Sequence, residues 1–409
     1  MMHILDTLKD RGFIAQMTFE EDLYKQLERE STTLYVGLDP TADSLHIGHM
    51  IPVYAMAHFQ RAGHRPIILM GGGTAMIGDP SGKTALRAML TRETIDHNIR
   101  SIQAQLSRLV DFAEGRAILA DNGDWLRGLN YIDFMREIGA FFSVNRMLTA
   151  ECYKARLEKG LSFLEFTYML LQSYDFLELF RRYGCRVQVG GDDQWSNMLG
   201  GADLIRRKES QDAYVTTFKL LLTSDGRKMG KTEAGALWLD AARVSPYDFY
   251  QYWRNLDDAD VQKCLALLTF LSMDEVRRLG ALRDADINEA KRVLAYEVTK
   301  IAHGEQAAAD AQQAAAALFG DGGDRGGAPR VDITAGQLAQ DARLTTLLVT
   351  AGLAASRGEA RKLVQGGGVY LGESPVTDID HTVSAADFGT DGLLLRKGKK
   401  HYCRVTLRA

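Results

Sequence analysis

Between residues 30 and about 220, short apolar runs alternate with longer stretches whose apolar positions recur every three or four residues. A short apolar run predicts a buried strand, and the longer spacing predicts an amphipathic helix. The predicted strands are Leu34–Leu38, Pro66–Met70, Ala117–Ala120, Arg186–Val189 and Tyr214–Leu222, and the clearest helices are Glu93–Phe112 and Phe163–Tyr183. This alternation favours an α/β fold with a mainly parallel sheet, whose ligands bind at the carboxyl ends of the strands.

The pattern changes after Ser245. From there to about Leu318 strand-like runs disappear, and Ala, Leu, Arg and Glu recur with helical periodicity. The segment Gly320–Pro329 has the glycine-rich composition of a flexible linker. We therefore expect an α/β domain over residues 1–222, a lysine-containing loop and an α-helical domain over 223–319, a linker over 320–330 and a small α+β domain over 331–409.

Composition excludes few classes of protein. The 409 residues are 46% hydrophobic and 25% charged with a net charge of −4, as in an ordinary globular protein of two or three domains. The charge is unevenly spread, because the segment from Asp341 onward has ten Lys or Arg against seven Asp or Glu. The four cysteines are far apart, which disfavours a zinc site or disulfide framework and fits the cytoplasm. No secretion signal or membrane-spanning run is evident.

Two short segments carry complementary chemistry. His46 and His49 stand where the first strand gives way to a helix that we expect to begin near Gly48, beside unpaired N–H groups and the positive end of the helix dipole. The glycine leaves room for a ligand to approach the backbone. Lys228–Thr232 places two lysines around a glycine in a turn-forming loop. Either segment alone is more often an ordinary surface feature, but together they suit a triphosphate under attack at its α-phosphate.

Three polar residues share one face of the predicted helix Phe163–Tyr183. Tyr168, Gln172 and Asp175 are spaced i, i+4 and i+7, and the rest of the helix is largely apolar. Burying such a stripe is costly unless a partner satisfies it, so a ligand is one interpretation. From the spacing alone, a stripe facing solvent is equally open.

Two loops are also candidates for ligand binding. Gly78–Thr84 ends like a phosphate-binding P-loop, but Ile77 stands where the first glycine is required and Pro80 removes an amide. A P-loop kinase is therefore disfavoured. Gly190–Trp195 follows a predicted strand, and its paired glycines and carboxylates suit ribose hydroxyls. The alternative is that Asp192 or Asp193 only caps the next helix.

With its histidine and lysine segments, the chain resembles class I aminoacyl-tRNA synthetases. It is similar to the bacterial tyrosyl-tRNA synthetase family over four further segments, which are Tyr35–Pro40, Gly78–Lys83, Tyr168–Asp175 and Val187–Trp195. The resemblance implies a Rossmann-like catalytic domain, an α-helical anticodon-side domain and a C-terminal RNA-binding domain like that of a ribosomal small-subunit protein. It implies a tyrosine–tRNA ligase that makes tyrosyl-adenylate from tyrosine and ATP and then charges tRNA(Tyr).

The resemblance also implies a role for individual residues. Those expected to act on the phosphates and in catalysis are Thr41, His46, His49, Lys83, Arg87, Lys228 and Lys231. Those expected to bind tyrosine are Tyr35, Asp79, Tyr168, Gln172, Asp175 and Gln188, with Tyr35 and Asp175 at the phenol hydroxyl. Those expected to bind ATP or the adenylate are Asp39, Gly48, Gly191, Asp193, Gln194 and Lys231. The family's lysine signature is commonly Lys-Met-Ser-Lys-Ser, so Gly230 and Thr232 are departures, and we expect the glycine to loosen the loop.

The C-terminal segment is predicted to contain a helix, a turn, a second helix, a glycine break and a strand. By resemblance it binds RNA through Arg357, Arg361 and Lys362 and through the basic turn Arg396–Lys400, which includes Lys399 and Lys400. An ordinary basic surface would be the preferred interpretation if this segment were seen alone.

The expected partners are tRNA(Tyr), tyrosine, ATP accompanied by Mg²⁺, and a second copy of the chain in a homodimer, with no structural metal, membrane or DNA. The alternatives left open are a tryptophan-specific relative, whose pocket would not need hydroxyl readers, and a non-catalytic RNA-binding protein of synthetase descent. The latter would be expected to lose one of His46, His49, Lys228 and Lys231, and all four are present.

Overall fold

The computed structural model describes the chain except for residues 1, 80–89, 158–159, 233–234, 320–328, 373, 390–391, 399–400 and 409. It divides into two compact units, Met1–Glu305 and Gln306–Ala409. The predicted linker lies largely outside the described residues, and the domain boundaries stay predictions. No helix in the described part of the chain is long and apolar enough to cross a membrane.

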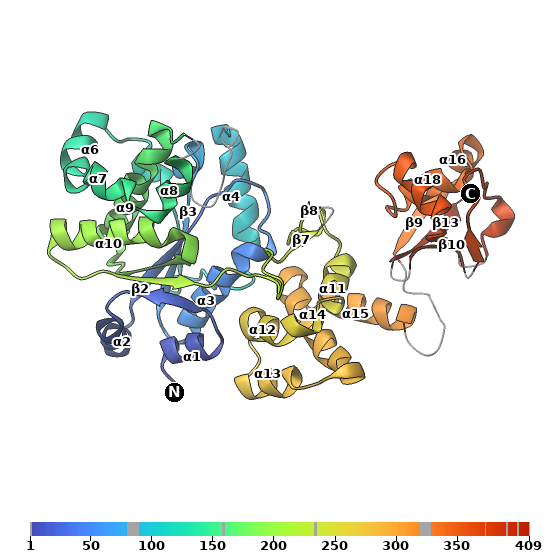
Figure 1. Cartoon of the computed structure of the whole chain (residues 1–409), viewed down its shortest axis with the longest axis horizontal. Coiled ribbons are helices and arrows are strands. Elements are labelled where there is room, and N and C mark those ends of the chain that lie inside the picture. Colours follow the sequence, from blue (N-terminus) through green and yellow to red (C-terminus); the bar gives the residue numbers. More distant parts are fainter. Residues whose placement is uncertain are drawn as a thin grey trace. The chain divides into compact units, whose positions relative to one another are not determined.

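The first unit contains a six-stranded sheet in the order β1-β6-β5-β2-β3-β4 (Figure 1). Its strands are β1 (Ile14–Met17), β2 (Thr33–Leu38), β3 (Arg65–Met70), β4 (Ile118–Asp121), β5 (Val187–Gly191) and β6 (Tyr214–Phe218). All neighbours are parallel except β1, which pairs antiparallel with β6. The predicted α/β fold is therefore confirmed.

Some element ends differ from prediction. The strand predicted over Tyr214–Leu222 ends at Phe218, because the chain there turns away toward the lysine loop. The helix predicted over Glu93–Phe112 is α4 (Arg92–Leu106) and begins at a Thr91 cap. The edge strand β1 is short and only partly buried, so its sequence lacks the strong apolar run that marks the other strands.

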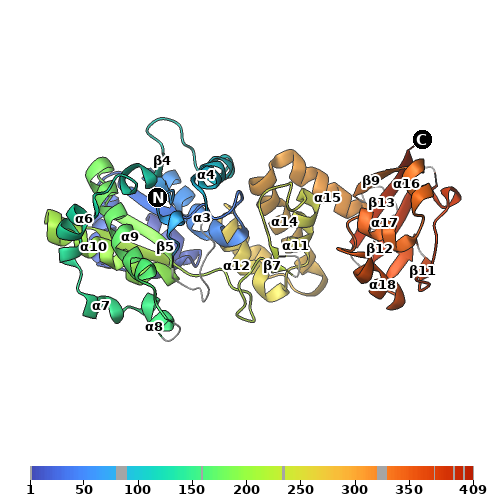
Figure 2. The same ribbon diagram turned by 90° about the horizontal axis from the view of Figure 1, so that it is seen from above.

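Helices flank the sheet, with α3 on one side and α9 and α10 on the other (Figures 1 and 2). The helices of this part are α1 (Ile4–Asp10), α2 (Glu20–Arg29), α3 (Met50–Arg61), α4, α5 (Gly123–Leu126), α6 (Tyr131–Glu137), α7 (Val144–Leu148), α8 (Glu151–Leu157), α9 (Phe163–Tyr183) and α10 (Trp195–Glu209). The ring of Tyr35 on β2 packs against Phe176 on α9 with centroids 5.2 Å apart. This contact places the sheet and α9 on either side of the site described below.

A helical region completes the first unit with α11 (Pro246–Arg254), α12 (Asp258–Leu268), α13 (Met273–Gly280) and α14 (Ile287–His303), preceded by the small hairpin β7 (Lys231–Thr232) and β8 (Gly235–Ala236). The helical periodicity after Ser245 is thus confirmed. The nearly buried Arg11, just after α1, joins this region to the α/β part. Its guanidinium donates to the carbonyls of Ala266 (2.8 Å), Thr269 (3.0 Å) and Leu271.

The second unit begins within α15 (Glu305–Phe319) and continues as a five-stranded sheet in the order β11-β10-β12-β13-β9. Its elements are β9 (Arg330–Thr334), α16 (Ala335–Gln340), α17 (Leu344–Thr350), α18 (Arg357–Gln365), β10 (Val369–Leu371), β11 (Ser374–Val376), β12 (Leu393–Lys397) and β13 (His401–Arg408). The apolar sides of α17 and α18 share one core with the strands. The helices, glycine break and strand follow in the predicted order, and this α+β arrangement is confirmed.

Candidate active site

A cavity of about 670 Å³ opens at the carboxyl ends of the parallel strands, between the sheet, the start of α3 and α9. Its volume lies in the range typical of ligand sites. Most of the predicted site residues line it: Tyr35, Asp39, Thr41, His46, Gly48, His49, Asp79, Tyr168, Gln172, Asp175, Gln188, Gly191, Asp193, Gln194 and Lys228. Lys83 and Arg87 lie outside the described residues, as does the side chain of Lys231.

Helix α9 supplies the polar stripe of the cavity. Ser162 caps its start, with the Ser162 hydroxyl accepting from the Glu165 amide and the Glu165 carboxylate accepting in return, and Gly184 ends it in a left-handed conformation. Tyr168 is only 6% and Asp175 only 2% exposed. The alternative of a stripe facing solvent is therefore wrong, because this face of the helix turns toward the cavity.

Asp175 is the most buried carboxyl group among the described residues that line the cavity. Its Oδ2 accepts from Asn122 Nδ2 (2.9 Å) and its Oδ1 from Trp125 Nε1 (2.7 Å). Burial raises the pKa of Asp175 to about 8, and the two donors only partly oppose that shift. Sequence analysis missed Asn122 and Trp125. The available signal was the polar pair Asp121-Asn122 directly after a predicted strand, at the edge where ligands bind.

Several polar atoms near Asp175 have no protein partner. The Tyr35 hydroxyl is buried without a hydrogen bond among the described residues, as are Oε1 of Gln172 and Oε1 of Gln188. Burial, followed by the charge of Asp175, raises the pKa of Tyr35, so its hydroxyl stays protonated. Buried polar groups are normally paired, so this cluster indicates a ligand with polar atoms of its own.

A hydrogen-bonded chain links this end of the cavity to its middle. The Asn122 amide donates to Thr74 Oγ1 (3.0 Å), and that hydroxyl donates to Asp39 Oδ1 (3.0 Å). The Tyr168 hydroxyl donates to the other Asp39 oxygen at 3.4 Å. Asp39, which the resemblance assigned to ATP, therefore also holds Tyr168 on the polar face of α9.

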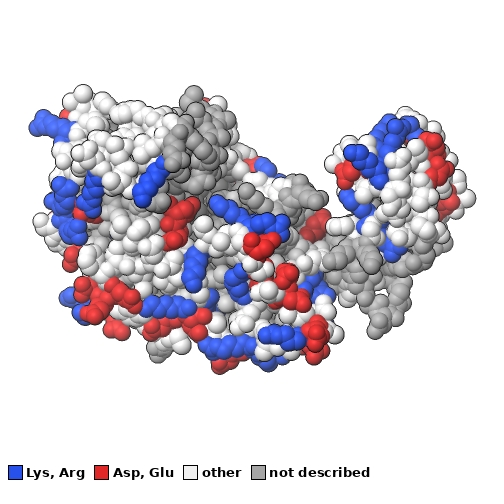
Figure 3. Space-filling view, in the orientation of Figure 1, with Lys and Arg blue, Asp and Glu red and all other residues white. Residues whose placement is uncertain are grey.

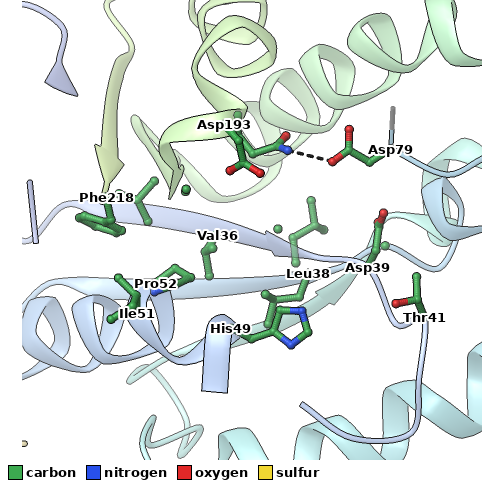
Figure 4. Close-up of a pocket in the computed structure, with 18 of the residues that line it drawn as sticks. Val36, Leu38, Asp39, Thr41, His49, Ile51, Pro52, Asp79, Asp193 and Phe218 are labelled. Atoms are coloured by element: carbon green, nitrogen blue, oxygen red, sulfur yellow. Dashed lines mark hydrogen bonds between the residues drawn. The ribbon is translucent and has the colours of Figure 1, made fainter. Parts of the chain in front are cut away.

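Asp79 and the β5–α10 segment face each other across the cavity. Gln194 Nε2 donates to Asp79 Oδ2 at 2.8 Å, and Asp193 lies beside this bridge (Figure 4). Neither Asp192 nor Asp193 caps a helix, because Gly191 and Gln194 occupy the two N-cap positions. The capping alternative is therefore wrong.

The two neighbouring aspartates have different environments. Asp192 Oδ1 accepts from Gln16 on β1 (2.8 Å) and from Thr217 on β6 (2.7 Å), which links these two strands. Asp193 lines the cavity. Burial raises the pKa of Asp193, Asp79 adds to the shift, and the charge of Lys228 opposes it.

His46 and His49 stack with ring centroids 3.8 Å apart, in a 3-10 turn over Ile47–His49 that leads into α3. Nδ1 of His46 accepts from the Gly48 amide (3.1 Å), and Nδ1 of His49 accepts from the His46 amide (3.3 Å). A neutral imidazole that accepts at Nδ1 carries its proton on Nε2. A Cβ on Gly48 would lie 3.0 Å from the His46 ring, so this glycine makes room for the histidine cap as well as for a ligand.

The lysine loop lies at the same end of the cavity. Lys228 is exposed, whereas Met229 and Gly230 are buried. Gly230 has a φ of +81°, which favours glycine, and a Cβ there would lie 2.1 Å from Ile47 Cγ2. Its amide and carbonyl are both hydrogen-bonded. The expectation that Gly230 loosens the loop therefore differs from the structure, in which the glycine permits close packing between the two signature segments.

The basic residues of the second unit are partly neutralised. Arg357 pairs with Asp341 (3.0 Å) and Lys397 with Glu359 (2.9 Å). Arg361 and Lys362 are exposed and have no ion-pair partner within the described part of the unit. Lys399 and Lys400 lie outside the described residues. In Figure 3, Lys and Arg gather along one edge of the visible face of this unit, and most of its Asp and Glu lie along the opposite edge.

Comparison with known proteins places these features in a family. Residues 27–320 match the family of tRNA synthetases class I (W and Y), and residues 326–405 match the tyrosine–tRNA ligase SYY-like C-terminal domain. The chain is 56% identical over 407 residues to the tyrosine–tRNA ligase of Caldanaerobacter subterraneus subsp. tengcongensis, covering 100% of both chains. It is 58% identical over 405 residues to that of Clostridium tetani, covering 99% of both.

A solved structure shows the same fold. The first part of the chain resembles a C-terminally truncated mitochondrial tyrosyl-tRNA synthetase of Aspergillus nidulans, with a TM-score of 0.69 and 29% identity, over 78% of this chain and 95% of that one. The match to the synthetase family spans more than half of the chain, and the full-length relatives agree with it. The chain therefore belongs to the class I tRNA synthetases of the tryptophan and tyrosine group.

Proposed function

We propose that the cavity forms tyrosyl-adenylate from tyrosine and ATP, and that the tyrosyl group then passes to the 3′ end of tRNA(Tyr). The full-length identity of 56–58% to tyrosine–tRNA ligases gives the chain that ligase activity. The same likeness makes it an enzyme rather than a non-catalytic RNA-binding relative. A P-loop kinase is set aside by the family.

The single observation that carries the choice of tyrosine is the buried polar group at the deep end of the cavity. Asp175 and Tyr35 lie together there, and the Tyr35 hydroxyl has no partner among the described residues. A phenol hydroxyl would donate to Asp175 and accept from Tyr35. Phenylalanine would leave both groups unpaired, and tyrosine-specific synthetases are the established example of rejection by this means. Tryptophan would offer no hydroxyl to this pair.

The middle of the cavity suits the amino-acid backbone. Asp79, Tyr168, Gln172 and Gln188 line it, and an ammonium group would be held by the Asp79 carboxylate and the neighbouring oxygens. Binding would bring the tyrosine carboxylate toward the histidine pair. This placement turns the attack on ATP into a reaction between two groups held in one site.

The open end of the cavity suits ATP. Gly48 and Gly191 leave its backbone accessible, and Asp193, Gln194 and Asp39 offer acceptors and donors for the ribose. The Nε2–H groups of His46 and His49, the Thr41 hydroxyl and the Lys228 ammonium would stabilise negative charge as pyrophosphate leaves. By resemblance Lys83, Arg87 and Lys231 join them. No group of His, Cys, Asp and Glu within the described residues is arranged as a metal cage, so Mg²⁺ would come bound to the ATP phosphates.

We further propose that the second unit holds tRNA. Arg361 and Lys362 on α18 are exposed and can contact phosphates, and Arg357 and Lys397 could do so by leaving their carboxylate partners. The protein is proposed to work in the cytoplasm, where its four cysteines, which form no disulfide, would stay reduced.

A homodimer is proposed as the working form. Exposed apolar side chains gather from α6 to the start of α9, at Tyr131, Ile132, Val144 and Phe163, each more than half exposed. Monomeric proteins seldom expose so many large apolar groups in one segment. Sedimentation of the protein at micromolar concentration would test this proposal, and a monomer would contradict it.

Amino-acid-dependent exchange of pyrophosphate into ATP tests the function. With each of the twenty amino acids in turn, exchange is expected with tyrosine and not appreciably with phenylalanine or tryptophan. Equal exchange with phenylalanine would contradict the roles of Tyr35 and Asp175. Absence of exchange with every amino acid would contradict the proposed reaction.

A further inference from the structure

The lysine loop is attached to the helical region at the two buried residues that follow Lys228. The Gly230 amide donates to the hydroxyl of Tyr252 on α11 at 2.9 Å. The Met229 sulfur lies 3.5 Å from the thiol of Cys264 on α12, and both side chains are buried. Lys228 itself is exposed and forms an isolated bridge with Leu222. The position of its backbone is therefore set by its neighbours rather than by packing of its own side chain.

The same face of α12 also holds the segment that leads into the loop. Asp260, Lys263 and Cys264 are spaced i, i+3 and i+4, so they share one side of the helix. Asp260 Oδ2 accepts from the Ser224 amide at 3.1 Å. Lys263 Nζ donates to the Leu222 carbonyl (2.6 Å) and to Asp260 Oδ1 (2.7 Å). The helix thus contacts the chain on both sides of the exposed tip that carries Lys228.

The buried carboxylate of Asp260 makes the attachment of the loop to α12 specific. Its carboxylate is 1% exposed, and burying a charge is costly unless it is paired and hydrogen-bonded. Here Lys263 and the Ser224 amide satisfy the carboxylate. Lys263 also donates to the Leu222 carbonyl, and Ser224 belongs to the segment that leads into the loop. The buried charge therefore fixes the loop to α12 in one register.

Gly230 is also packed against the segment that carries His46 and His49. The Leu237 amide donates to the Gly230 carbonyl (2.7 Å), and the Ile47 amide donates to the Leu237 carbonyl (3.0 Å). Ile47 also fills the space next to the Gly230 α-carbon. Gly230 is thus held between Tyr252 of the helical region and Ile47 of the α/β part, and both ribbon views show the hairpin β7–β8 beside α11 (Figures 1 and 2).

We propose that Tyr252 and the Asp260–Lys263–Cys264 face of α12 form a platform that positions Lys228 over the pyrophosphate of ATP. These side chains are positioning residues for adenylate formation, since they act through the loop and do not line the cavity. The inference rests on the proposed function of the site. Its physical basis is that a flexible lysine stabilises a transition state well only when its backbone is already in place.

The direct test is Tyr252→Phe, which removes the acceptor for the Gly230 amide and keeps the ring. The rate constant of the burst of tyrosyl-adenylate formation should fall about tenfold, as expected when one hydrogen bond that holds the loop in place is lost. The burst amplitude and the KM for tyrosine should not change, because the sites remain intact. Tyr296→Phe on α14 is the matched control, since that hydroxyl has no hydrogen bond within the described residues, and it should leave the rate unchanged.

Lys263→Gln is a second variant, in case Tyr252→Phe folds poorly. It removes the cation from Asp260 and weakens the contact with the Leu222 carbonyl, and it should slow the burst in the same way. A fall in burst amplitude at an unchanged rate constant for both variants would show a merely structural role and would overturn the proposal.

A double-mutant cycle separates this proposal from the proposed function. In a Lys228→Ala background, Tyr252→Phe should cause no further fall in the burst rate constant, because the group that it positions is gone. A full tenfold fall in that background would overturn the platform while leaving the ligase function intact. If Lys228→Ala alone leaves the rate unchanged, the role of the lysine loop itself is wrong, and the platform has nothing to position.

Discussion

The two ends of the cavity are built in opposite ways. At the end proposed to bind tyrosine, Asp175, Tyr168 and Tyr35 are almost fully buried, and side-chain hydrogen bonds fix Asp175 and Tyr168. At the end proposed to bind ATP, Lys228 is exposed, and the fixed contacts are mostly made by the backbone around His46 and Gly230. Burial at the first end makes an unpaired polar group expensive, which gives selectivity. Under the proposed function, exposure at the second end would let the highly charged pyrophosphate form and leave.

The largest expected effect is at the buried end. Asp175→Asn should lower kcat/KM for tyrosine by an amount equivalent to roughly 4 kcal/mol of activation free energy, because the phenol hydroxyl loses its carboxyl acceptor in a dry site. Pyrophosphate exchange over a range of tyrosine concentrations measures it. A loss of less than a factor of ten would show that the deep end does not read the hydroxyl.

The same variant should gain stability in the absence of ligand. The pKa of Asp175 is raised in the folded protein to about 8, so its contribution to stability is present at low pH and is lost as pH rises through 8. The stability advantage of Asp175→Asn over the unmodified protein should therefore grow as pH rises from about 4 to about 8. Urea unfolding at pH 5 and pH 8 checks the sign, and a difference that does not grow with pH would contradict it.

At the exposed end the expected effect is smaller and is confined to the rate. Lys231→Ala should slow adenylate formation by on the order of 3 kcal/mol of barrier while tyrosine binding is retained, because pyrophosphate charge develops mainly in the transition state. Stopped-flow measurement of the adenylate burst together with equilibrium tyrosine binding separates the two quantities. Equal losses in the rate of adenylate formation and in the affinity for tyrosine would contradict the assignment of different roles to the two ends of the cavity.

Removing the segment after Leu318 should change neither tyrosine binding nor adenylate formation in the cavity. A truncated chain ending at Leu318 should keep tyrosine-dependent exchange but transfer tyrosine to tRNA about tenfold less well at moderate salt, since phosphate contacts are lost. Exchange and aminoacylation measured side by side on both chains decide this. Unchanged transfer would mean that the second unit does not hold tRNA, and loss of exchange would place the domain boundary elsewhere.

The contrast between the ends also explains what the sequence could predict. The polar stripe lies on one helix, so the spacing of Tyr168, Gln172 and Asp175 was enough to put them on one face, though not to decide between cavity and solvent. The end proposed to bind ATP joins segments far apart in the chain, and only the family resemblance could bring His46 and Lys228 together. Asn122, Trp125 and Tyr252 were missed because their roles depend on tertiary contacts that no local pattern reports.

The smallest expected effect tests whether the hydrogen-bond donors to Asp175 influence its pKa. Trp125→Phe removes the Nε1 donor to Asp175 Oδ1 and keeps an aromatic ring there. Losing a hydrogen bond to the ionised form raises the pKa of a carboxyl group further, so the pH dependence of kcat/KM for tyrosine should shift to higher pH, with a loss of about 1 kcal/mol near neutrality. Trp253→Phe is the control, because Trp253 Nε1 is buried without a partner among the described residues and belongs to the helical region. It can lower stability, but it should leave the pH profile in place. A profile that Trp125→Phe does not move would mean that desolvation alone sets the charge of Asp175, and that the deep end owes its selectivity to burial rather than to its hydrogen-bonded partners.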